Sequence, residues 1–251
     1  MPAGMQSTEA DQIAESVQQY SKFEDLPLVK TGCDSYSSWH PKFKQFSPMI
    51  AVNDLARELT ALTPNNNWVS KNGNDVHLVI TGGEPLLGWQ RAYPELLEQP
   101  AMRTLRNITF ETNGTQLLSD EFASFISNWP MYDLAQHSNR EVTFSVSPKL
   151  SASGEAWADA INPDVIAQYQ DVGTVYLKFV VSSPAHIEEA RRAVDAYRAA
   201  DFTGAVYLMP VGGVNEVYND NRFNVAEAAM REGWYYSPRL HLDLWGNRWG
   251  T

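Results

Sequence analysis

The stretch "VYLKFVVSSPAHIEEARRAVDAYRAA", residues 175–200, decides the fold class, because a strand pattern passes directly into a helix pattern. Its first part, 175–183, is a nearly continuous apolar run, which is typical of a strand buried on both faces. Ser183 then precedes Pro184, in the usual order of an N-cap and a first helical residue. Apolar residues follow at the spacing of one helix face, at Ile187, Ala190, Val194 and Tyr197.

The same alternation of strand and helix recurs along most of the chain. Further buried strands are predicted at 76–81, 107–113, 141–148, 205–213 and 239–245. Helices are predicted at 51–62, 93–102, 119–129, 162–172 and 224–233, with Ser119 and Asn162 as N-caps. Strands that alternate with helices pair in parallel through helical crossovers. No Gly-x-Gly-x-x-Gly loop occurs, so an α/β fold with an open, partial barrel is favoured over a dinucleotide-binding fold.

The domain organisation follows from where this alternation begins. Residues 1–24 are rich in Gln, Ser, Glu and Ala and carry little pattern, so we expect a mobile arm or the remnant of an insertion. Residues 25–251 contain no evident linker and are predicted to form a single partial β/α barrel domain.

Composition limits the classes of function. The 43% of hydrophobic residues is enough for a packed core, and the net charge of −11 disfavours nucleic acid and anionic membranes as partners. No apolar run approaches the ~20 residues of a membrane-spanning helix, and the first residues lack a signal-peptide pattern. We therefore expect a soluble cytoplasmic protein. Its single cysteine, Cys33, can form no internal disulfide, and on composition alone it is interpreted as a buried apolar residue.

The segments that follow the predicted strands share one chemistry. They read "TGGEP" (81–85), "ETNGT" (111–115), "SVSPK" (145–149), "MPVGG" (209–213) and "WGNRWGT" (245–251). Small residues let a backbone approach a ligand, and hydroxyl and amide groups form hydrogen bonds to it. Each segment alone could be a plain turn, but in parallel α/β folds such segments meet at one edge of the sheet. They predict a site for a polar small molecule, whereas Lys178 and His241 are expected only to pack or to face solvent.

Together with "CDS" at 33–35 and the final "WGT", these segments resemble the 7-carboxy-7-deazaguanine synthase family from residue 25 to residue 251. The resemblance is closest to a long phage variant, in which an insertion precedes the third cluster cysteine. It implies a radical S-adenosylmethionine (SAM) lyase with a shortened TIM-like β/α barrel. The implied reaction converts 6-carboxy-5,6,7,8-tetrahydropterin to 7-carboxy-7-deazaguanine, towards queuosine in tRNA or deazapurines in DNA.

The resemblance also implies cofactors, partners and site residues. The cofactors are a [4Fe-4S] cluster, SAM and Mg2+; the partners are the pterin, a flavodoxin-like electron donor and a second copy, in the host cytoplasm if a phage encodes the chain. Cys33 matches a cluster ligand and Ser35 the Mg2+ ligand, while Thr81 and the carboxylate of Thr251 match substrate contacts. The positions that match SAM contacts are Gly83, Ser147, Pro148, Lys149, Met209, Pro210, Val211 and Gly212.

The chain departs from the family before Cys33. The first strand of the family, with its Gln-Gly-Glu-Gly segment, and two further cysteines are absent, and residues 1–32 contain neither cysteine nor histidine. Since a [4Fe-4S] cluster needs three protein thiolates, we expect the chain alone to be inactive. Several explanations stay open: a fragment that starts at an internal methionine, a second polypeptide that supplies the cysteines, a degenerate homologue, or a non-catalytic barrel that binds a pterin, purine or nucleoside.

Overall fold

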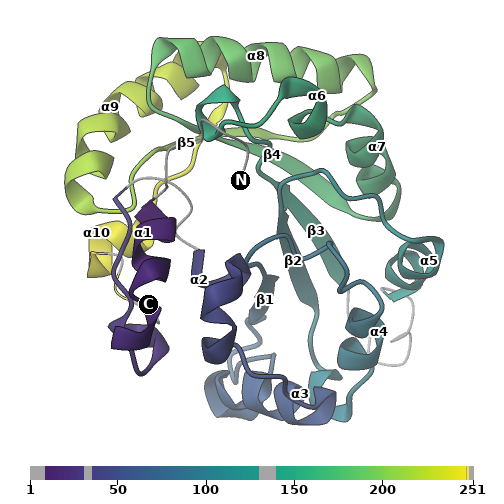
Figure 1. The fold of residues 1–251 in the computed structure, drawn as a ribbon. Helices are drawn as coiled ribbons and strands as arrows, with labels where there is room; N and C mark the ends of the chain where they lie inside the picture. Colours follow the sequence, from purple (N-terminus) through teal and green to yellow (C-terminus); the bar gives the residue numbers. More distant parts are fainter. Residues whose placement is uncertain (1–8, 31–35, 130–139, 247, 249–251) are drawn as a thin grey trace.

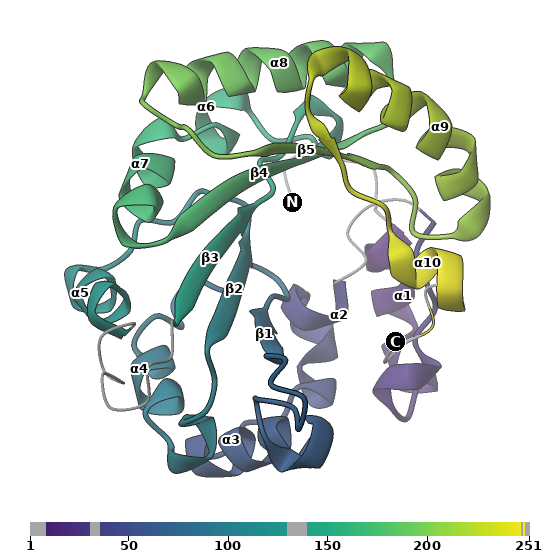
Figure 2. The same cartoon turned by 180° about the vertical axis from the view of Figure 1, so that it is seen from behind.

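The computed structural model describes residues 9–30, 36–129, 140–246 and 248. Within them, six parallel strands form one sheet in chain order, each strand beside the next (Figure 1). The strands are β1 (His77–Ile80), β2 (Asn107–Thr112), β3 (Glu141–Val146), β4 (Thr174–Val181), β5 (Val206–Pro210) and β6 (Tyr235–Tyr236). The sheet curves, with helices around its outer face, and β1 does not pair with β6 (Figures 1 and 2). The predicted α/β class and the open, partial barrel are therefore confirmed.

The helices alternate with these strands. They are α1 (Glu9–Glu15), α2 (Tyr36–Trp39), α3 (Val52–Ala61), α4 (Ala92–Leu97), α5 (Asp120–Asn128), α6 (Trp157–Ala160), α7 (Pro163–Val172), α8 (Pro184–Ala199), α9 (Asn215–Glu232) and α10 (Leu240–Trp245). Ser119 and Ser183 cap α5 and α8, because their hydroxyls accept hydrogen bonds from the backbone N–H groups of Phe122 and His186, respectively. Asn162 occupies the N-cap position of α7, as predicted, but its side chain does not bond to the helix: its amide instead donates to the carbonyl of Asp159 at 2.8 Å.

The main core lies between the sheet and its outer helices. Side chains alternate along each strand, so that Phe110 of β2 and Phe144 of β3 are fully buried against the helices. The ring of Phe144 stacks on Phe110, with centroids 5.6 Å apart, and on Tyr169 of α7, with centroids 4.4 Å apart. The remaining side chains of the strands point to the opposite, concave face of the sheet.

The strand predicted at 239–245 is wrong, because these residues form helix α10. Leu240, Leu242 and Leu244 alternate with polar residues as in a strand, but only Leu242 is buried, while Leu240 and Leu244 are 58% and 57% exposed. Gly246, with φ of 63°, ends the helix in the left-handed conformation that glycine adopts readily. His241 consequently belongs to a helix, and the last strand is the short β6.

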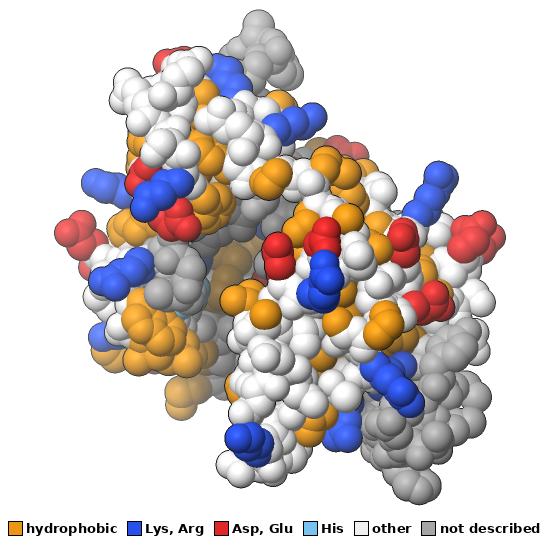
Figure 3. Space-filling view, turned by 90° about the horizontal axis from the view of Figure 1, so that it is seen from below, with side chains coloured by type: hydrophobic (Ala, Val, Ile, Leu, Met, Phe, Trp, Pro, Cys, Tyr) orange, Lys and Arg blue, Asp and Glu red, His pale blue; other side chains and the backbone are white. Residues whose placement is uncertain are grey.

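The N-terminal residues from Glu9 on pack into a small second core. Ile13 and Val17 of this segment are buried against Leu26, Tyr36 and Phe43. In both ribbon views, α1 and α2 lie between β1 and α10 (Figures 1 and 2). Seen from below, the molecule is hollowed between the part around α1 and α10 and the part around α3 (Figure 3). Among the helices that the structure describes, none has the length and apolarity to cross a membrane.

Candidate functional site

The loops after the parallel strands meet at one edge of the sheet, as the sequence predicts. Thr81 and Gly83 follow β1 and are exposed. The segment after β3 is half-buried, except for the buried Pro148, and so is the end of β5, except for the buried Pro210 and Gly212. The described members of the predicted site that the fold brings to this edge are Thr81, Gly83, Ser147, Pro148, Lys149, Met209, Pro210, Val211 and Gly212. Their roles towards a ligand stay predictions.

The carboxylate of Glu84 ties the first two of these loops together. It accepts hydrogen bonds from the Thr112 hydroxyl and the Asn113 N–H, both at 2.7 Å, and from the Leu86 N–H at 3.1 Å. Two buried tyrosines support the same loops: Tyr93 donates to the carbonyl of Pro85 and Tyr169 to that of Gln116. Burial, reinforced by the charge of Glu84, raises the pKa of both phenols further above neutral pH, where they are protonated donors.

The residues on either side of Cys33 are fixed at the same edge. Before it, the carbonyl of Lys30 accepts a hydrogen bond from the Gly213 N–H at 3.2 Å, in the loop after β5. A Cβ atom on Gly213 would lie 2.2 Å from the carbonyl oxygen of Val29, so only glycine fits this contact. After Cys33, Trp39 lies against Gly83, where an added Cβ would meet the Trp39 Cβ at 3.2 Å. The described residues before and after segment 31–35 therefore contact the loops after β5 and β1, respectively.

Three predicted site residues, Cys33, Ser35 and Thr251, lie outside the described residues. The predicted cluster and Mg2+ positions thus have no geometry to report. In the described ranges, no three histidine, cysteine, aspartate or glutamate side chains come together as a metal site.

The concave face carries a charged pair that sequence reasoning missed. Lys178 of β4 donates to Glu111 of β2 at 2.9 Å, and so reaches across the intervening strand β3. Ser145 lies opposite Glu111 in the register of β3, and its buried hydroxyl has no hydrogen-bond partner among the residues that the structure describes. The expectation that Lys178 only packs or faces solvent is therefore wrong. The alternation of buried and less buried residues along β4 could have indicated this position. Leu177 and Phe179 are buried on one face of the sheet, so Lys178 between them points to the other face.

Three tyrosines extend this face towards β6. The rings of Tyr176 and Tyr207 have centroids 5.1 Å apart, as do those of Tyr207 and Tyr235. Tyr235 is 60% exposed, so this aromatic surface is open to solvent at its end. The concave face thus joins aromatic rings to a carboxylate, a cation and a hydroxyl, a set of groups that suits a flat, polar ring.

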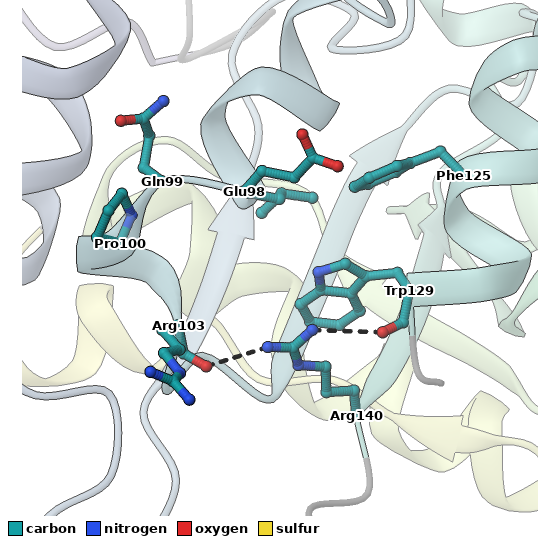
Figure 4. A pocket seen from close by; sticks show the side chains of 8 residues that line it. Glu98, Gln99, Pro100, Arg103, Phe125, Trp129 and Arg140 are labelled. Carbon is teal, nitrogen blue, oxygen red and sulfur yellow. Dashed lines mark hydrogen bonds between the residues drawn. The ribbon is translucent and has the colours of Figure 1, made fainter. Parts of the chain in front are cut away.

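A separate pocket of about 370 Å³ lies on the outer side of the sheet, near α4 and α5 (Figure 4). The guanidinium of Arg140 lies over the Trp129 ring, 4.7 Å from its centroid, and donates to the carbonyls of Trp129 and Arg103 (Figure 4). None of the strand-end residues lines this pocket, so it is distinct from the candidate site.

No protein-family model matches the chain. Among solved structures, it is similar to a radical SAM methyltransferase from Sphaerobacter thermophilus, with 13% identity and a TM-score of 0.46 over 79% of this chain and 60% of that one. It is also similar to Streptococcus suis SuiB bound to S-adenosylmethionine, with 15% identity and a TM-score of 0.44 over 78% and 46% of the two chains. These scores are too low to support an assignment.

Relatives in sequence are closer. A 7-carboxy-7-deazaguanine synthase of Pyrobaculum aerophilum is 34% identical over 175 residues, 69% of this chain and 67% of that protein. Proteins of the same name from Halobacterium salinarum and Rhodopirellula baltica are 33% and 28% identical, over 86% and 87% of this chain and 77% and 75% of their own. At this identity and coverage, the chain belongs to the 7-carboxy-7-deazaguanine synthase family.

Proposed function

We propose that this chain binds 6-carboxy-5,6,7,8-tetrahydropterin on its concave face and acts in its radical SAM conversion to 7-carboxy-7-deazaguanine. The observation that carries the proposal is the pair Glu111–Lys178, with the unpartnered Ser145 hydroxyl beside it, on the open face of a chain of this family. A reduced pterin offers ring N–H groups and an amino group to a carboxylate, and its own carboxylate to a lysine.

The edge of the sheet supports a second ligand, SAM. SAM carries an ammonium and a carboxylate, which need hydrogen-bonding groups and a cation within reach of the backbone. Gly83, Ser147 and Gly212 offer such backbone, and Lys149 is half-buried without an ion-pair partner in the ranges that the structure covers. We assign the SAM contacts to these loops and Mg2+ to Ser35, as the resemblance implies.

The residues of this chain do not by themselves fit a [4Fe-4S] cluster. Such a cluster needs three protein thiolates, and the chain contains one cysteine. We derive no chemical step through the cluster, and we propose that a longer chain or a second polypeptide must supply the other thiolates for turnover.

Reconstitution with iron and sulfide under anaerobic conditions tests this point. The 251-residue chain is expected to lack the visible sulfur-to-iron charge-transfer absorbance of a [4Fe-4S] cluster. It is also expected to produce no 5′-deoxyadenosine from SAM. The matched sample is the same chain supplemented with a polypeptide that carries the two missing cysteines. Cluster absorbance in the unsupplemented chain would contradict the proposal.

Anaerobic calorimetry with 6-carboxytetrahydropterin tests the concave face, and it needs no cluster. Lys178→Met is expected to weaken binding about tenfold, because the variant loses a cation and releases Glu111 from its ion pair. Glu111→Gln is expected to weaken binding by a similar factor. Lys71→Met, at an exposed lysine in the turn before β1, serves as the control. No measurable binding to the unaltered chain would refute the assignment of the substrate.

A second candidate function is a pterin-binding barrel without catalysis, and the single cysteine favours it. The two functions differ in one result. If pterin binds, but SAM is not cleaved even when the missing cysteines are supplied, the chain is a binding module.

A further inference from the structure

Helix α1 contacts the chain on both sides of Cys33, although sequence analysis assigns it no role. A carboxylate oxygen of Glu9 accepts a hydrogen bond from the Lys30 N–H at 2.9 Å, three residues before Cys33. A carboxylate oxygen of Asp11 lies 3.6 Å from the Nε2 atom of His40, seven residues after it. One short helix therefore links the two flanks of the same segment.

The flank before Cys33 is held from two directions. The N–H of Lys30 is bonded to Glu9, and its carbonyl accepts from the Gly213 N–H. Both backbone groups of this one residue are thus paired, the first to α1 and the second to the loop after β5. Since a backbone residue with both groups paired loses most of its conformational freedom, Lys30 is a fixed point three positions from the cysteine.

The flank after Cys33 is held in a similar way. Tyr36 is fully buried and donates its hydroxyl hydrogen to the carbonyl of Pro27 at 2.7 Å, which joins this flank to the first one. The His40 ring packs edge-on against Phe43, with centroids 5.4 Å apart, and its Nδ1 accepts from the Lys42 N–H. The imidazole is therefore oriented with Nε2 towards Asp11.

The packing of α1 has the same partners. Its buried residues belong to a cluster drawn only from residues 10–43, separate from the core of the barrel: Ala10, Ile13, Ala14, Val17, Leu26, Val29, Tyr36 and Phe43. Burial of these apolar side chains therefore stabilises α1 against the flanks of Cys33 and not against the sheet.

We propose that Glu9 and Asp11 are positioning residues, and that α1 is a clamp that fixes both flanks of the Cys33 segment at the carboxyl edge of the sheet. The importance of Cys33 rests on the proposed function, but the clamp does not. It can be tested with the thiol alone, without iron, SAM or pterin.

The test uses the fact that the chain has one cysteine, so that a thiol reagent such as 5,5′-dithiobis(2-nitrobenzoate) reports on Cys33 only. Glu9→Ala is expected to raise the rate of modification about tenfold, which corresponds to ~1.4 kcal/mol, because the Lys30 N–H loses its charged acceptor. Glu9→Gln keeps an acceptor oxygen, and its rate is expected to lie close to that of the unaltered chain. Asp11→Ala is expected to raise the rate through the other flank.

Glu15→Ala is the matched control, because Glu15 lies in the same helix with an exposed side chain that bonds to no other described group. Urea unfolding of each variant separates local release from global loss of stability. The rate of tryptic cleavage after Lys30 provides a second measurement, and it is expected to increase in Glu9→Ala. If Glu9→Ala and Asp11→Ala stay folded and both keep the unaltered rates, or if Glu15→Ala raises them equally, the clamp is refuted. Failure of pterin binding would leave these rates unaffected.

Discussion

Phe144→Ala is expected to lower the free energy of unfolding by about 3–5 kcal/mol, the usual cost of removing a large buried ring. The Phe144 ring is fully buried in the middle of the sheet and stacks on Phe110 on one side and Tyr169 on the other. Its removal leaves a cavity that neither ring can fill without leaving its own packing. Because β3 leads directly into Ser147 and Lys149, the same change should loosen the predicted SAM contacts.

Urea unfolding followed by circular dichroism measures this effect. Phe223→Ala is the matched control, since Phe223 is 69% exposed on α9 and its ring lies under the guanidinium of Arg222, 5.0 Å from the ring centroid. It should change the free energy of unfolding by less than about 1 kcal/mol. A loss below about 1 kcal/mol for Phe144→Ala would contradict the described core.

Glu84→Ala is expected to lower the free energy of unfolding by about 2–3 kcal/mol and to weaken ligand binding at the edge of the sheet. The variant leaves the Thr112 hydroxyl and the N–H groups of Leu86 and Asn113 without their acceptor. Each donor that loses its partner costs about 1–3 kcal/mol when buried, and water compensates part of this in a half-buried loop. The loops after β1 and β2 would then separate.

Chemical denaturation and pterin calorimetry together measure the two consequences. Glu84→Gln keeps one acceptor oxygen and should lose about half as much. Glu95→Ala removes an exposed glutamate on α4 whose hydrogen bond to a side chain, that of Gln99, is accepted by its backbone carbonyl, and it should alter neither quantity. If Glu84→Ala matches Glu95→Ala in both measurements, the carboxylate does not hold these loops.

Much of the barrel was predictable, because local patterns determine it. The run at 175–183 and the Ser183–Pro184 start of the next helix predict β4 and α8 almost to the residue. Sequence patterns gave wrong predictions for short elements whose conformation depends on tertiary packing. The alternating leucines of 239–245 look like a strand, yet the helix is set by burial of Leu242 alone and by Gly246. Helix α9 likewise begins at Asn215 instead of 224, in a polar stretch that gives no clear periodicity.

The candidate site also has a part that the sequence predicts and a part that it does not. Its loops were predictable, because parallel strands place their carboxyl ends at one edge whatever the details of packing. The contacts across the sheet were not, since Glu111 and Lys178 are 67 positions apart and nothing local relates them. The contact of Glu9 with Lys30 is equally invisible in sequence. By contrast, the spacing of Ala10, Ile13, Ala14 and Val17 was a helical signal within residues expected to form an arm or an insertion remnant.

The chain-order pairing of the strands has a consequence for biosynthesis. Because each strand pairs with the one made just before it, β1 to β4 can assemble as soon as Val181 has left the ribosome, without waiting for distant segments. The contact of Gly213 with Val29 and Lys30 is different, since it joins residues made before β1 to a loop made after β5. This contact can therefore form only after β5 has been made, when β1 to β4 already provide a template for it.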